Sequence, residues 1–181
     1  MVCRLSKYRK NNFTFEVNNF LIFFSFLENK SGTRQTVPTL GCELYIQFFQ
    51  FPDGTFIKCE LLDTNSQNYI FDVAKIYLPK IDCCFLVYDI TNKESFEKCQ
   101  NYCREAILLN CKKDVKVMLI GNKSDLEDKR EVPKEIGFKF ANENNYFFRE
   151  TSCLNISSMV EAFETFIINN FKEDLILKKI E

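Results

Sequence analysis

The sequence predicts an α/β fold built on a mostly parallel six-stranded sheet with helices on both faces. Near-continuous apolar runs at residues 82–90 and 115–120 are typical of strands that are buried on both faces. Stretches with helical spacing alternate with such runs after residue 55, as in parallel βαβ units with right-handed crossovers. A length of 181 residues suits one domain with a sizeable core.

The N-terminal third is predicted to hold a β-hairpin. Residues 42–62 alternate between apolar and polar on either side of the turn sequence Pro52-Asp53-Gly54. Residues 1–19 are polar, basic and Asn-rich and have no helical period. We expect residues 20–29 to form a short helix and residues 30–41 to form a loop.

The remaining elements follow in order along the chain. We expect a helix at 67–78 closed by Pro79, a helix at 93–110 capped by Asn92 or Ser95, a helix from Pro133 to 144, a short strand at 146–148 and an amphipathic helix at 156–172.

Composition excludes several classes of function. The chain has no His, which rules out Ser-His-Asp and Cys-His catalysis and His-ligated zinc. A net charge of −1 gives no strong field to recruit nucleic acid, so we expect no nucleic-acid partner. The nine Cys include no Cys-x-x-Cys pair, and we find no signal peptide or spanning segment, which together predict a cytoplasmic protein. The C-terminus has no Cys for prenylation, so we expect no lipid anchor.

The sequence Gly-Asn-Lys-Ser-Asp at residues 121–125 follows a predicted buried strand. Asp125 is placed to accept two hydrogen bonds from a flat partner with two adjacent donors, which guanine has and adenine lacks. Such charge-assisted bonds contribute about 1.5–3 kcal/mol each. For the tetrapeptide Asn-Lys-x-Asp alone, a solvated turn after a strand is an equal alternative.

Polar residues follow the other predicted strands as well. Asp63, Asp89 and residues 150–153 come at strand ends, like residues 121–125. Because ligands in parallel sheets bind beyond the carboxyl ends of the strands, we expect these four groups to meet at one edge.

From residue 20 onward the chain resembles a Ras-superfamily small GTPase, closest to the Rab branch. The stretches that carry the resemblance are Val37-Pro38-Thr39-Leu40-Gly41, Leu62-Asp63-Thr64-Asn65-Ser66-Gln67, Val87-Tyr88-Asp89-Ile90-Thr91, Glu94-Ser95-Phe96, residues 121–125 and Glu150-Thr151-Ser152-Cys153. The resemblance implies a small GTPase domain at 20–174, between a divergent segment at 1–19 and a tail at 175–181.

For the base, the resemblance implies that Asn122 and Asp125 hold guanine and that the stem of Lys123 lies on the base plane. The backbone around Ser152 and Cys153 would meet the base carbonyl.

For the phosphates, the resemblance implies Mg²⁺ bound together with GTP or GDP. Thr39 would complete the Mg²⁺ shell, Asp63 would hold the ion through water, and Gln67 would orient the attacking water as the catalytic residue. Taken alone, Thr39 and Gln67 read as ordinary loop residues.

The implied biology is that of a monomeric molecular switch in vesicle traffic. Its partners would be GTP or GDP and effector and regulator proteins bound through the switch regions. Its place would be the cytoplasm or the periphery of endomembranes.

The phosphate-binding loop of that family, Gly-x-x-x-x-Gly-Lys-Ser/Thr, is absent from the sequence, whose five Gly never fall in that pattern. Losing about four hydrogen bonds to phosphate would cost on the order of 6 kcal/mol, or roughly 10⁴-fold in affinity. Ser66 also replaces the Gly of Asp-x-x-Gly. We therefore expect impaired GTP binding and hydrolysis and leave open whether the chain is an enzyme; the alternatives are a nucleotide-free pseudo-GTPase module and, more remotely, a flavodoxin-like binder.

The first strand of the resembled fold lies in mid-sheet, between residues 55–62 and 82–90. Residues 13–17 alternate and would bury Glu16 there without a partner. We therefore expect a degenerate first strand, with residues 1–19 as a divergent or wrongly predicted start in place of a lost first exon.

Overall fold

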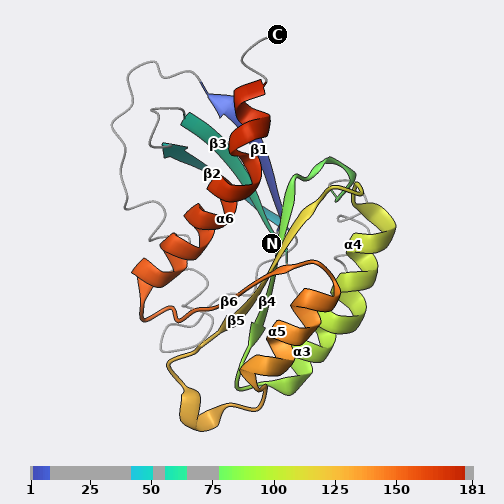
Figure 1. Cartoon of the computed structure of the whole chain (residues 1–181), viewed down its shortest axis with the longest axis vertical. Helices are drawn as coiled ribbons and strands as arrows, with labels where there is room; N and C mark the ends of the chain where they lie inside the picture. Colours follow the sequence, from blue (N-terminus) through green and yellow to red (C-terminus); the bar gives the residue numbers. More distant parts are fainter. Residues whose placement is uncertain (1, 9–41, 51–55, 65–77, 178–181) are drawn as a thin grey trace.

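The computed structural model describes residues 2–8, 42–50, 56–64 and 78–177, and every structural statement below concerns these residues. They form an α/β fold around a six-stranded sheet of order β2-β3-β1-β4-β5-β6 (Figure 1). The strands are β1 Val2–Tyr8, β2 Cys42–Gln50, β3 Phe56–Thr64, β4 Cys83–Asp89, β5 Lys116–Asn122 and β6 Phe147–Glu150. The α-helices are α3 Lys93–Lys98, α4 Arg104–Asn110, α5 Lys134–Glu143 and α6 Ile156–Leu177.

The predicted fold class is confirmed in its layers and in its strand directions. β4 pairs with β5, and β5 with β6, in parallel, whereas β2 and β1 each pair antiparallel with their neighbours. Four strands, β3 to β6, therefore point the same way. The predicted hairpin at 42–62 corresponds to β2 and β3.

The central slot of the sheet differs from the expectation. It holds β1, from residues that the sequence analysis placed outside the domain, and β1 runs antiparallel to both of its neighbours. Residues 13–17, the candidate considered for this slot, lie outside the described residues. A mid-sheet gap would leave two rows of backbone groups unpaired, and a strand of either direction removes most of that cost.

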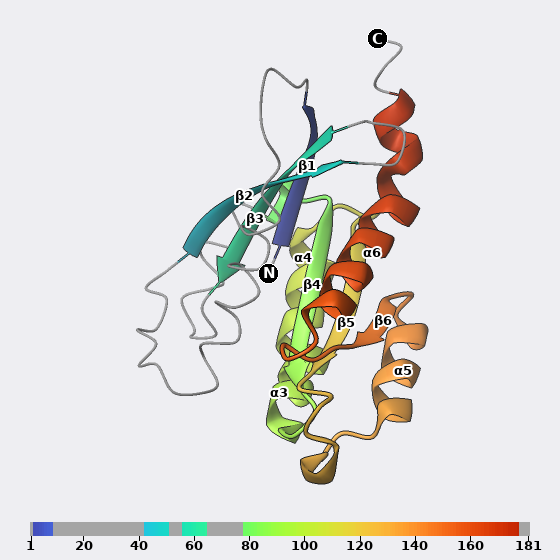
Figure 2. The ribbon, with the colours of Figure 1, turned by 90° about the vertical axis from the view of Figure 1, so that its left-hand side faces the viewer.

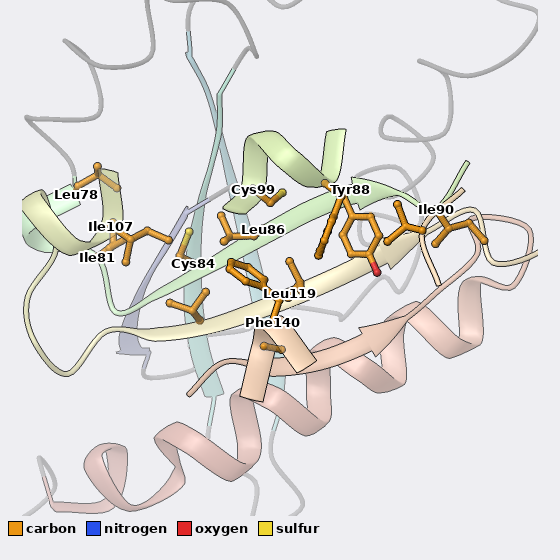
Figure 3. Close-up of a cluster of buried hydrophobic side chains, with 14 residues drawn as sticks. Leu78, Ile81, Cys84, Leu86, Tyr88, Ile90, Cys99, Ile107, Leu119 and Phe140 are labelled. Carbon is orange, nitrogen blue, oxygen red and sulfur yellow. The ribbon is translucent and has the colours of Figure 1, made fainter. Parts of the chain in front are cut away.

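Helices cover the sheet on both faces. A continuous helical segment, α3, the π-helical turn η2 (Cys99–Cys103) and α4, packs with α5 on one face, and α6 packs on the other (Figures 1 and 2). Along β4, Phe85 joins the α6 side, where it stacks on Phe163 with ring centroids 5.0 Å apart. Leu86 and Tyr88 join the opposite core (Figure 3). This alternation explains why β4 reads as an uninterrupted apolar run.

Several element boundaries confirm or refine the expectations. The helical segment at 93–110 begins at the N-cap Asn92, whose side-chain oxygen accepts a hydrogen bond of 3.1 Å from the Ser95 N–H. Pro133 directly precedes α5, and α6 extends five residues beyond the predicted end at 172. The predicted helices at 20–29 and 67–78 fall outside the described residues, apart from a single 3-10 turn at Leu78–Lys80. Within the described part, no helix is both long and apolar enough to cross a membrane.

Candidate nucleotide-base site

The ends of β4, β5 and β6 meet at one edge of the sheet, which we call the rim (residues 89–91, 121–125 and 150–153). Two backbone hydrogen bonds join its parts: Thr151 N–H to Gly121 O at 2.9 Å and Ser124 N–H to Thr151 O at 3.1 Å. The β4 end is joined as well, because Asp89 is level with Asn122 in the parallel register. The rim therefore brings together three of the four predicted strand-end groups.

Asp125 is exposed at the rim, and its carboxylate is held in place from below. The hydroxyl of Ser152, a residue only 6% exposed, donates a hydrogen bond to Asp125 Oδ1. The Ser152 oxygen in turn accepts the Leu154 N–H at 3.1 Å. This chain fixes the carboxylate while its remaining lone pairs stay available to a ligand.

Asn122 lies beside the same loop. Its side-chain amide nitrogen is 3.4 Å from the Cys153 sulfur. The sequence analysis gave Cys153 only a backbone role, whereas the structure shows that its thiol also positions Asn122.

Lys123 makes the closest ion pair of the rim. Its Nζ lies 2.6 Å from Asp89 Oδ2, and the residue adopts a left-handed backbone with φ of 64°. The other Asp89 oxygen accepts both the N–H and the hydroxyl of Thr91, at 2.8 and 2.7 Å. Partial burial acts to raise the pKa of Asp89, but the hydrogen bonds from Lys123 and Thr91 outweigh it and hold that pKa below its usual range.

Asp89 thus sets the position of the Lys123 ammonium, a role that the sequence analysis did not assign. The sequence did contain a signal for this role: Asp89 ends the strand that neighbours the strand followed by Asn-Lys-x-Asp.

A second ion pair supports the rim from behind. The Arg130 guanidinium contacts both Glu150 oxygens, at 2.7 and 3.0 Å, and the two side chains are only 14% and 9% exposed. Arg130 also donates to the Val132 carbonyl and pairs with Glu127. Bidentate pairing of this kind fixes the start of the 150–153 loop. Nothing in the sequence pattern identified Arg130.

The residues predicted to serve Mg²⁺ and the phosphates do not complete the rim. Thr39 and Gln67 lie outside the described residues. Asp63 is near the end of β3, but Leu62 of β3 and Cys84 of β4 both pair with Val2, which places Asp63 well behind Asp89 along the sheet. This register corrects the expectation that Asp63 meets the other strand ends.

The fit of the two ligand groups therefore differs. The donors and acceptors of Asn122, Asp125 and Ser152 fit a guanine base. Among the residues predicted to serve Mg²⁺, Asp63 is described and Thr39 is not, and the register keeps Asp63 away from the rim, so the described residues bring no predicted Mg²⁺ ligand to it.

Comparison with known proteins identifies the family of the chain. The family model for the Ras family matches residues 17–172. Ras-related protein Rab-8B of Homo sapiens is 35% identical over 149 residues, covering 82% of this chain and 70% of the relative, and Rab-8B of Pongo abelii gives the same values. Ras-related protein Rab-17 of Homo sapiens is 34% identical over 75% of this chain and 64% of the relative. The chain belongs to the Ras family of small GTPases, within its Rab branch.

Proposed function

We propose that this chain is a Rab-type protein of vesicle traffic that recognises the guanine base, binds GDP and GTP weakly, and hydrolyses GTP poorly. The observation that carries the proposal is the Asp125 carboxylate, held by the Ser152 hydroxyl beside Asn122. Its partners would be effector and regulator proteins that bind the monomer.

Base recognition follows from the chemistry of the rim. An exposed carboxylate that is fixed in orientation accepts the ring N–H and the exocyclic amine of guanine together. Adenine lacks this pair of donors and would leave the carboxylate unpaired. Two charge-assisted bonds of about 1.5–3 kcal/mol each correspond to roughly 10²- to 10⁴-fold in affinity.

Weak phosphate binding follows from the direction of β1. Tyr8 ends β1 opposite Phe56, the first residue of β3, and so lies at the end of the sheet away from Asp89. The C-terminal end of β1 therefore lies at the opposite end of the sheet from the rim, and the sequence holds no Gly-x-x-x-x-Gly-Lys-Ser/Thr. The Mg²⁺ and hydrolysis roles that the resemblance gives Thr39, Asp63 and Gln67 stay predictions.

A nucleotide-free interaction module is the second candidate. The contact between Lys123 and Asp89 favours it, because the Lys123 ammonium is already neutralised within the protein. Such a module would bind its partners through the β2–β3 hairpin.

A titration of the purified chain with fluorescent GDP, with and without Mg²⁺, separates the two candidates. We expect weak binding that changes little when Mg²⁺ is removed. Guanosine should compete and adenosine should not. Asp125→Ala should lower affinity by at least about 100-fold, since two bonds to the base are lost.

Asp128→Ala is the matched control, because Asp128 is an exposed carboxylate three residues further on, in the turn Glu127–Lys129. It should bind GDP like the unaltered chain. Absence of GDP binding, or equal loss in both variants, would refute base recognition at Asp125 and favour the nucleotide-free module.

A further inference from the structure

Two cysteines lie four residues apart on the helical segment at 93–110, outside the rim. Cys99 and Cys103 are the first and last residues of the π-helical turn η2. Residues four apart in a helical segment share one face, so these two side chains are neighbours on the turn. Isolated π-helical turns are rare and often mark functional sites.

The two thiols have unequal surroundings. Cys99 is 3% exposed, and its sulfur lies 3.7 Å from the Val87 carbonyl oxygen of β4 (Figure 3). Cys103 is partly exposed at the helix surface. A reagent in solution therefore reaches Cys103 first, with the buried sulfur of Cys99 beside it.

The thiol contact also divides the proton between them. The hydrogen bond from Cys99, opposed by burial, lowers the pKa of Cys103 to about 7, and the same bond together with burial raises the pKa of Cys99. The lowered pKa favours the thiolate of Cys103, which is the nucleophilic form.

We propose that Cys99 and Cys103 form a reversible oxidation site that reacts with hydrogen peroxide to give an intrahelical disulfide. The Cys103 sulfur attacks the peroxide, the O–O bond breaks, one water leaves and Cys103 becomes a sulfenic acid. The Cys99 sulfur then attacks Cys103, the S–O bond breaks and a second water leaves. Two thiols lose two electrons in all, and hydrogen peroxide gains them.

Closing the disulfide requires a small local movement. Cβ atoms four residues apart on a helix are about 5–6 Å apart, whereas a disulfide needs roughly 3.5–4.5 Å. We place this adjustment in the π-helical turn, because it already departs from the regular helical hydrogen-bond pattern.

Neighbouring cysteines provide a contrast. Burial raises the pKa of Cys111 to about 11 and that of Cys84 to about 12, so both stay protonated at neutral pH. Cys111 is partly exposed like Cys103, but among the described residues no thiol shifts its pKa, which burial alone raises. It is therefore the appropriate internal control.

Trypsin makes the test direct, because it cleaves after Lys98 and Arg104 and so releases both thiols in one peptide, 99–104. The next peptide, 105–112, contains Cys111 alone. The full chain is treated with dilute hydrogen peroxide, blocked with N-ethylmaleimide, digested and analysed by mass spectrometry. We expect peptide 99–104 to be unalkylated and two hydrogens lighter than its reduced form, and dithiothreitol should restore it. Peptide 105–112 should be alkylated in full, with Cys111 oxidising at least about 10-fold more slowly.

Three variants, each checked for folding by circular dichroism, assign the steps. Cys99→Ser should stop at a sulfenic acid on Cys103 that dimedone traps, and Cys103→Ser should leave Cys99 reduced. Cys111→Ser should behave like the unaltered chain. Any of three results would overturn the proposal: alkylation of both sulfurs in peptide 99–104 after peroxide, equal oxidation rates for Cys111 and Cys103, or a cross-link to peptide 81–93. All three are measured on the unaltered chain, so they hold even if a variant fails to fold.

Discussion

The Tyr88 hydroxyl supports a quantitative prediction about the sheet beneath the rim. It is buried and has no hydrogen-bond partner among the described residues, one position before Asp89 (Figure 3). An unsatisfied buried polar group costs about 1–3 kcal/mol. Tyr88→Phe should therefore raise the free energy of unfolding by about 1 kcal/mol, the lower part of this range, because the ring packing is kept.

Gly121 lies directly opposite Tyr88 in the parallel register of β4 and β5. A Cβ at position 121 would lie 2.8 Å from the Tyr88 oxygen, 3.0 Å from its Cζ and 3.1 Å from Glu150 Cγ. Such overpacking costs about 1–3 kcal/mol, so Gly121→Ala should lower the free energy of unfolding by that amount. In the Tyr88→Phe background the shortest contact is gone. The cost of Gly121→Ala should then fall by about 1 kcal/mol, which is a coupling between neighbouring sites.

Urea denaturation followed by circular dichroism measures this double-mutant cycle on the unaltered chain, the two single variants and the double variant. It requires that all four unfold in one step with the same m-value. The coupling should exceed about 0.5 kcal/mol, the limit within which independent sites add. Additive effects of Tyr88→Phe and Gly121→Ala would show that the hydroxyl is not what a side chain at 121 meets, and the packing argument would be wrong.

Four further substitutions test contacts in the rim and beside it. Glu150→Gln should lower the free energy of unfolding by about 3 kcal/mol, because it removes the buried carboxylate and leaves Arg130 with only its exposed partner Glu127. Glu127→Gln, whose wild-type side chain is 64% exposed, should cost under about 1 kcal/mol, and urea denaturation compares the two variants. The unaltered chain should be more stable than Asp89→Asn at pH 7, and this difference should disappear as the pH falls below about 4. The reason is that the lowered pKa of Asp89 stabilises the fold only while the carboxylate is ionised. Acid unfolding curves in which the difference persists at pH 2 would contradict this. Asn92→Ala should cost about 1 kcal/mol by removing the N-cap, and an unchanged melting temperature would refute that role.

Local pattern and strand order were enough to predict that residues 89–91, 121–125 and 150–153 meet at the rim. The apolar runs located β4 and β5 because both are buried on two faces. Parallel direction then required their ends, and residues 150–153 after them, to meet. The contact between Asp125 and Ser152 follows from that arrangement.

The direction of β1 and the partners of long side chains could not be predicted in this way. Backbone hydrogen bonds satisfy a strand in either direction, so pairing alone did not decide how Val2–Tyr8 would fill the central slot. The partner of Lys123 is 34 positions away and that of Arg130 is 20, and only the folded geometry selects Asp89 and Glu150 among many carboxylates.

The three ion-pair and hydrogen-bond contacts that fix the rim are all made within the segment from β4 to the residues before α6. Asp89 with Lys123, Ser152 with Asp125 and Arg130 with Glu150 join residues 89–152 to one another, and none of these three contacts includes β1, β2 or β3. On the proposed function, the reversed direction of β1 would therefore remove phosphate contacts without loosening the Asp125 carboxylate. Affinity and selectivity should separate as a result: the chain should bind guanine nucleotides weakly and still prefer them over adenine nucleotides by the roughly 10²- to 10⁴-fold that two bonds to Asp125 provide.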